Sequence, residues 1–135
     1  MSPLLIRGGT VIDSTGSRDE DIAVVDNIIV PIDTVPSSAT VIDASGCVVS
    51  TGLVDLHTHL GEPGDEAAET MVTGGRAAVL GGFTTVLAMP NTMPPVDTAA
   101  VVEHIRTLAK AALCRVEIAG CVTVGAAGTH LAPLG

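Results

Sequence analysis

The chain has 135 residues, 47% of them hydrophobic, and its 15 acidic side chains against 6 basic ones give a formal net charge of −9. This length suits one ordinary domain. The acidic balance argues against binding to nucleic acid or to an anionic membrane, because both require clustered Lys and Arg. With one Phe and neither Trp nor Tyr, the core has to be built from small aliphatic side chains. Such a core is typical of a parallel sheet covered by helices.

The cysteines and the N-terminus indicate the compartment. Cys47, Cys114 and Cys121 are odd in number and fit no zinc or redox spacing, which predicts free thiols in a reducing cytoplasm. The first residues lack the basic and long apolar regions of a secretory signal. No apolar run approaches the ~18 residues that a membrane-spanning helix needs. We therefore expect a cytoplasmic protein.

Residues 1–51 are short β-rich runs divided by turn signals. Gly8-Gly9 interrupts the first run, and Asp26-Asn27 is a turn pair between two others. No helical period occurs in this part. The pattern predicts a small antiparallel sheet as the first domain.

Residues 52–135 follow another pattern and form the predicted second domain. Apolar strands are expected at 52–60, 83–90 and 115–124, with helices between them at 65–82 and 97–113. Asp65, Glu66 and Glu69 are expected in the first turn of the first helix, and Asp97 or Thr98 should cap the second. Two glycines at 74–75 weaken the first helix, so we expect another element to pack closely there. The alternation predicts a parallel sheet with right-handed crossovers.

The stretch VDLHTHLGEPG, residues 54–64, holds the clearest chemical signal. His57 and His59 are two residues apart on a strand, so their side chains should share one face. Two imidazoles so placed can bind one metal ion. They lie where the strand ends, which is the edge of a parallel sheet at which active sites collect.

Three blocks of the sequence resemble successive blocks of bacterial dihydroorotases, of the amidohydrolase superfamily. They are GLVDLHTHLGEPG, TGGRAAVLGGFTTVLAMPNTMPPVD and CVTVGAAGTHLAPLG. The resemblance implies an α/β fold, the front part of a metal-dependent (β/α)8 barrel, with residues 1–51 as a small β-sandwich segment before it. It also implies hydrolysis of a cyclic amide, dihydroorotate to carbamoyl aspartate in pyrimidine biosynthesis, at one or two zinc ions.

The resemblance assigns roles to individual residues. His57 and His59 match the first two metal ligands, Asp55 matches a supporting position on the same strand, and Asn91 matches an amide that holds substrate. Gly61 stands where dihydroorotases usually carry an Arg that binds the substrate carboxylate. A glycine cannot replace a bidentate Arg–carboxylate pair, so we expect Gly61→Arg to raise turnover of dihydroorotate. The other metal ligands and the catalytic aspartate are expected beyond Gly135, so the chain alone should be inactive.

Other functions remain open at this stage. One alternative is an allantoinase-like or hydantoinase-like cyclic amidase. Another is a non-catalytic, dihydroorotase-like scaffold subunit, for example for a carbamoyltransferase, and Gly61 keeps this alternative open. A chain with three of eight barrel strands would expose strand edges and apolar faces, so we expect a homo-oligomer or association with a second chain.

Overall fold

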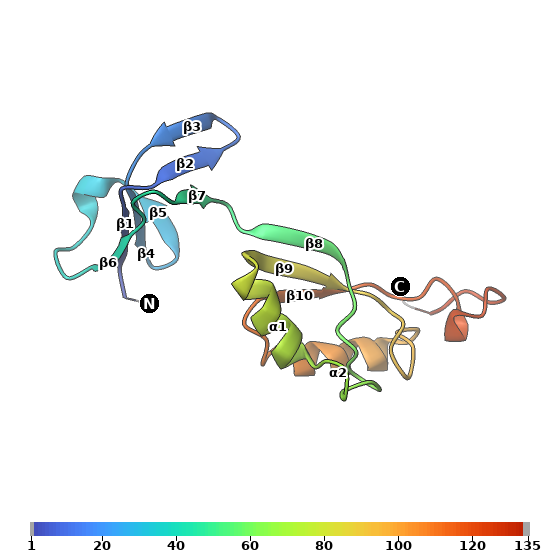
Figure 1. Ribbon diagram of the computed structural model, residues 1–135. Helices are drawn as coiled ribbons and strands as arrows, with labels where there is room; N and C mark the ends of the chain where they lie inside the picture. Colours follow the sequence, from blue (N-terminus) through green and yellow to red (C-terminus); the bar gives the residue numbers. More distant parts are fainter. Residues whose placement is uncertain (1, 134–135) are drawn as a thin grey trace. The chain divides into compact units, whose positions relative to one another are not determined.

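The computed structural model describes residues 2–133 (Figure 1). The last two residues of the predicted second domain therefore lie outside the described part. The chain divides into two compact units, and the division falls between Thr51 and Gly52.

The first unit consists of seven short strands in two sheets. One sheet has the order β5-β4-β1-β6 and the other the order β3-β2-β7. The bounds are β1 Leu4–Arg7, β2 Thr10–Asp13, β3 Gly16–Asp19, β4 Ile22–Val25, β5 Ile28–Val30, β6 Thr40–Asp43 and β7 Val48–Ser50, with a 3-10 helix at Ile32–Thr34. The predicted β-rich character is confirmed, but the purely antiparallel arrangement is wrong. β1 pairs with β6, and β2 with β7, in parallel, because a long connection separates the two strands of each pair.

The turn residues predicted from the sequence connect the strands of this unit. Gly8 has φ 75° between β1 and β2, and Asp26 and Asn27 have φ 49° and 65° between β4 and β5. Positive φ at two consecutive residues matches the tight hairpin turns that Asn and Asp tolerate.

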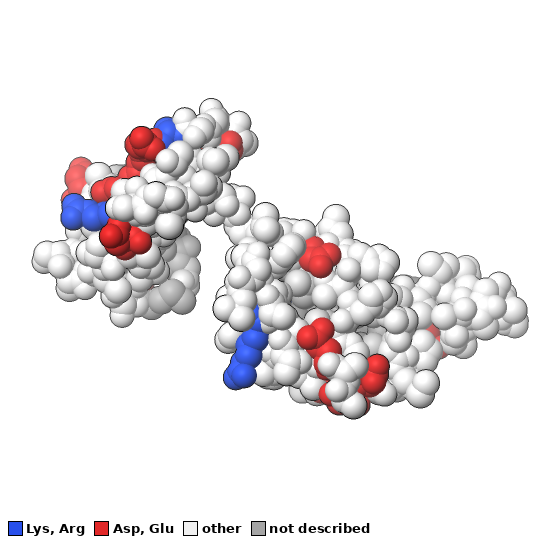
Figure 2. All heavy atoms as spheres, in the orientation of Figure 1, with Lys and Arg blue, Asp and Glu red and all other residues white. Residues whose placement is uncertain are grey.

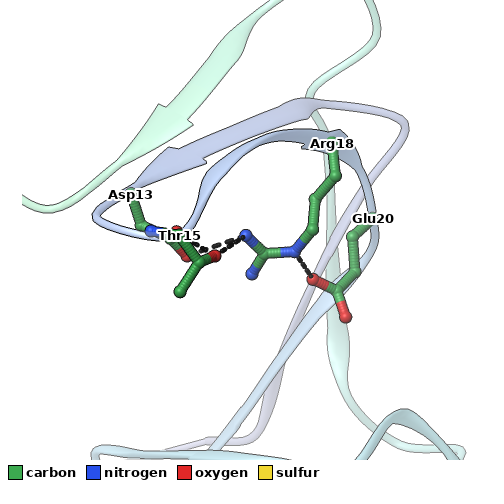
Figure 3. Close-up of polar contacts among 4 residues, drawn as sticks. All are labelled: Asp13, Thr15, Arg18 and Glu20. Atoms are coloured by element: carbon green, nitrogen blue, oxygen red, sulfur yellow. Dashed lines mark hydrogen bonds and ion pairs between the residues drawn. The ribbon is translucent and has the colours of Figure 1, made fainter.

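A polar network supports the β2–β3 hairpin (Figure 3). Arg18 donates to Asp13 at 2.8 Å and to Glu20 at 2.6 Å. The Thr15 hydroxyl also donates to Asp13, at 2.6 Å. The hydrogen bonds from Thr15 and then Arg18 lower the pKa of Asp13 from 3.8 to about 2.

The second unit alternates strands and helices. Its elements are β8 Leu53–Thr58, α1 Met71–Leu80, β9 Phe83–Ala88, α2 Ala99–Ala109 and β10 Arg115–Ile118, followed by a 3-10 helix at Val124–Ala126. The sheet order is β10-β9-β8, and both pairings are parallel. The predicted strand–helix alternation is confirmed, although β10 ends six residues earlier than expected. Among the residues that the structure describes, no helix has the length and apolar character needed to cross a membrane.

The two helices begin at threonines. Thr98 caps α2 as predicted, with its side chain accepting from the backbone N–H of Val101. The expected start of the first helix is wrong: Thr70 caps α1, and Thr70 and Thr73 exchange hydrogen bonds in a capping box. The cap gives the backbone N–H of Thr73 a hydrogen-bond partner, and the helix therefore begins after Thr70. Residues 65–69 lie before the helix.

The core of this unit lies between the sheet and the helices. Buried residues of both helices, of β9 and of the connecting loops form it: Leu60, Met71, Val86, Ala88, Val96, Ile105 and Cys114. The expected close approach at the paired glycines is confirmed. A Cβ on Gly74 would lie 2.4 Å from Leu60 Cδ2, and one on Gly75 would lie 3.0 Å from Ala112 Cβ. On the face shown in Figure 2, acidic side chains are more widespread than basic ones, in keeping with the negative net charge.

Candidate metal and substrate site

The predicted site residues gather where β8 and β9 end. Both strands run in the same direction, so their carboxyl ends lie at one edge of the sheet (Figure 1). His57 is in β8, His59 directly follows that strand, and Asn91 follows β9. The structure therefore brings together three residues that are up to 34 positions apart in the sequence.

A β-bulge in β8 sets the direction of the two histidines. Asp55 pairs with Val86 and Thr58 with Ala88, so three steps along β8 match two steps along β9. Because paired residues of parallel strands share a face, Asp55 and Thr58 face the helices together with buried Val86 and Ala88. His57 and His59 are exposed. The bulge therefore breaks the two-residue alternation of the strand between Asp55 and His57.

The two imidazoles lie beside each other. Their ring centroids are 5.1 Å apart and the ring planes are inclined by 65°. A tetrahedral ion bound to one nitrogen of each ring at ~2.0–2.1 Å would place the centroids about 5 Å apart. The spacing of the pair thus suits two ligands of one zinc ion.

Asn91 binds His59 directly. The distance between His59 Nδ1 and Asn91 Oδ1 is 2.8 Å. An amide oxygen only accepts hydrogen bonds, so His59 Nδ1 is the donor in this contact. The sequence interpretation gave Asn91 a role in holding substrate and missed this contact.

Asp55 contacts the backbone of the motif. Its carboxylate accepts from the backbone N–H of His57 at 2.9 Å, and this hydrogen bond holds the pKa of Asp55 below its usual value. The contact fixes the backbone beside the bulge, so Asp55 supports the position of His57.

A cavity of about 580 Å³ opens beside His59. It is lined by residues of three segments, the end of β8, the turns before α1 and the loop after β9: His59, Gly61, Gly64, Asp65, Ala68, Glu69, Met89, Asn91, Thr92 and Met93. His57 lies next to His59 but is not part of this lining. Among the described residues, the lining contains no Lys or Arg.

Two acidic residues of this lining were not predicted as site residues. Asp65 and Glu69 were assigned to the first turn of a helix, whereas the structure places them before α1, on the cavity wall. Within residues 2–133, neither forms an ion pair with Lys or Arg. One sequence signal could have placed both carboxylates before the helix. It is the Thr-x-x-Thr pattern of Thr70 and Thr73, which forms the cap of α1.

Gly61 occupies a position that excludes a side chain. Its φ is 68°, and a Cβ there would lie 2.8 Å from the carbonyl oxygen of Glu69 and 2.9 Å from that of Asp65. The backbone N–H of Asp65 also donates to Gly61 O at 2.8 Å, which closes the turn. An Arg at this position would require the backbone to move. The expected gain from Gly61→Arg therefore does not follow from this conformation.

The metal ligand set is partial. Among the described residues, no group of three or more His, Cys, Asp or Glu side chains is placed to hold an ion. His104 and His130 are both exposed on other elements of the chain. A catalytic zinc site uses about three protein ligands and one open position, so His57 and His59 fit two positions of such a site.

Comparison with known proteins places this arrangement in a family. The family model described as Dihydro-orotase-like matches residues 46–134. The chain belongs to this family. A dihydroorotase from Streptomyces coelicolor is 46% identical over 138 residues, which cover 100% of this chain and 32% of that protein. A dihydroorotase from Leifsonia xyli is 56% identical over 100 residues, which cover 73% of this chain and 23% of that protein. This member of the dihydro-orotase-like family thus spans about a third of the length of the Streptomyces relative.

Solved structures of related enzymes share the fold. The L-hydantoinase (dihydropyrimidinase) of Arthrobacter aurescens superimposes with a TM-score of 0.78 at 24% identity, over 91% of this chain and 28% of the other. The D-hydantoinase of Bacillus sp. AR9 gives a TM-score of 0.68 at 28% identity, over 85% and 26%. The dihydro-orotase-like chain therefore has the fold of one segment of these larger enzymes.

Proposed function

We propose that this chain is the front part of a zinc-dependent cyclic amidohydrolase barrel, and that dihydroorotate is the substrate of the whole protein. In this proposal residues 1–51 are a β-sandwich segment and residues 52–135 are the first βαβαβ units of the barrel. The adjacent imidazoles of His57 and His59 carry the proposal, because their spacing suits a shared ion beside a cavity. The 46% identity to a dihydroorotase supports the choice of substrate.

Each residue of the site has a defined part in this proposal. His57 and His59 hold one zinc ion, which supplies Lewis-acid activation of the ring carbonyl and of a water molecule. The amide oxygen of Asn91 accepts a hydrogen bond from His59, and its amide nitrogen is the group that would donate to substrate. We expect the remaining ligands and the catalytic acid or base beyond Gly135. A cytoplasmic protein that associates with itself or with a carbamoyltransferase would agree with this reaction.

Metal titration of the chain tests the ligand pair. We expect Co²⁺ or Zn²⁺ to bind, and we expect His57→Ala and His59→Ala each to abolish binding measured by absorption spectroscopy or calorimetry. His104→Ala is the matched control, since that imidazole is exposed in the middle of α2. Equal binding by all four proteins would refute the site.

A second candidate substrate is an uncharged cyclic amide such as a hydantoin. It is favoured by the cavity lining, which carries the carboxylates of Asp65 and Glu69 and leaves no room for a side chain at Gly61. Carboxylates repel a substrate carboxylate, and a site can select partners by such repulsion. The fold shared with the D-hydantoinase of Bacillus sp. AR9 agrees with this alternative.

Substrate competition separates the two candidates. A polypeptide that carries this sequence and any continuation of its reading frame should be assayed with dihydroorotate, a hydantoin and allantoin. Turnover of dihydroorotate that is lost in His57→Ala supports the first candidate, and preference for the uncharged rings supports the second. We expect no turnover from residues 1–135 alone. If metal binds but no substrate reacts with the longer polypeptide, the scaffold alternative replaces both.

A further inference from the structure

We propose that Asn91 is a positioning residue for His59, which fixes the tautomer and the direction of the imidazole before any metal arrives. This inference rests on the proposed function in one respect, namely that His59 is a metal ligand. It gives Asn91 a role separate from contact with substrate. The observation behind it is the 2.8 Å contact between His59 Nδ1 and Asn91 Oδ1.

The contact selects the nitrogen that remains available. A neutral imidazole has one N–H donor and one lone pair. Since the amide oxygen accepts a hydrogen bond from Nδ1–H, the lone pair of the neutral ring is on Nε2, which is the form a metal ligand requires. Metal-binding histidines commonly donate their other N–H to a neighbouring acceptor, and this partner fixes the orientation of the ring.

The backbone on both sides of the contact is held in place. Met89 N donates to Thr58 O at 2.9 Å, which joins the two strands one residue before His59. Pro90 O accepts from Val96 N at 3.1 Å and from Cys121 Sγ at 3.5 Å, directly before Asn91. A hydrogen bond between two fixed backbones restricts an exposed ring more than one between mobile loops.

The two histidines therefore differ in how firmly their rings are held before metal binds. Within the described residues, the His59 ring has a side-chain hydrogen-bond partner, whereas the His57 ring has none and lies beside the His59 ring. We infer that His59 is the preorganised ligand and that His57 adjusts to the ion. Loss of the amide should affect His59 alone in the metal-free chain.

Nuclear magnetic resonance of the metal-free chain tests this tautomer assignment. Imidazole nitrogen and carbon chemical shifts, recorded where the rings are neutral, should show the Nδ1–H form for His59. Asn91→Ala should convert it to the Nε2–H form that an unpartnered imidazole favours, and Asn91→Asp should keep Nδ1–H because it retains the acceptor. An Nε2–H form in the unmodified chain, or a tautomer that ignores Asn91→Ala, would overturn the inference.

Metal affinity provides the second measurement on the same proteins. We expect Asn91→Ala to weaken Zn²⁺ binding by about 10- to 100-fold, the loss typical of removing such a partner. Asn91 is exposed, so the variant should fold, and its melting curve checks this. Unchanged affinity would overturn the positioning role. If residues 1–135, which supply two ligands, bind no metal, the affinity comparison is made on the longer polypeptide, and absence of metal binding there refutes the proposed function. The tautomer measurement on the chain decides the contact with Asn91 in either case.

Discussion

Substitution of Gly61 by alanine measures how strongly the turn beside the histidines depends on glycine. A non-glycine residue in the left-handed region costs roughly 1–2 kcal/mol. At Gly61, the added methyl would also press on the carbonyl oxygens of Glu69 and Asp65, at 2.8 and 2.9 Å. Overpacking of this kind costs about 1–3 kcal/mol. The free energy of unfolding should therefore fall by about 2–5 kcal/mol in total.

Gly128→Ala is the matched control for this substitution. Gly128 has φ 75° in the same unit, and a Cβ there would meet nothing within 4 Å. It should lose only the backbone part, so the two variants should differ by about 1–3 kcal/mol. Each 1 kcal/mol corresponds to roughly 4–8 °C in Tm for a domain of about 60–100 residues. Equal losses of Tm in calorimetry would show that the turn relaxes freely and would refute the crowding.

Three further predictions concern the core, the hairpin and association. Met71 is 1% exposed at the start of α1, so Met71→Ala should lower the unfolding free energy by about 2–5 kcal/mol in denaturant titration, whereas Leu80→Ala, 90% exposed on the same helix, should change little. Asp13 has its pKa lowered from 3.8 to about 2, so its contribution to stability is present above pH ~3.8 and lost as pH falls through about 2. Arg18→Ala should raise that pKa in a carboxyl titration followed by nuclear magnetic resonance, and an unchanged value would contradict the network. Exposed apolar side chains on the strands and loops predict self-association in sedimentation, and a stable, cooperatively melting monomer would contradict this.

The sequence predicted the elements of the second unit better than their ends. Apolar periodicity sufficed for the alternation of strands and helices along the chain, and it limited the cap of α2 to Asp97 or Thr98, of which Thr98 is the cap. The start of α1 was misplaced, because acidic residues followed by Ala match a helical first turn as well as a loop. The Thr70–Thr73 capping box decides between these, and it depends on side-chain hydrogen bonds that composition does not reveal.

The sequence predicted His57, His59 and Asn91 as members of the candidate site, but it predicted neither Asp65 and Glu69 nor the contacts between the residues. The spacing of His57 and His59 indicated a ligand pair. The contact of His59 with Asn91 spans 32 positions and depends on how β8 and β9 align. The conformation of Gly61 is likewise invisible in the sequence, since glycine adopts either sign of φ with similar ease. Only the fold shows that a side chain at that position would meet two carbonyl oxygens.

The bulge in β8 determines at which positions of this strand a single-residue deletion could be accepted during evolution. A one-residue slip normally transfers every following side chain of a strand to the opposite face. Here, the extra residue lies between Asp55 and Thr58, whose partners are two apart on β9. A deletion of Leu56 would leave those pairings in place and give the strand a regular alternation from Asp55 to Thr58, with the histidines on their present face. Deletion at Val54 would instead shift the strand against its partner. The strand should therefore tolerate deletion of Leu56 and not deletion of Val54.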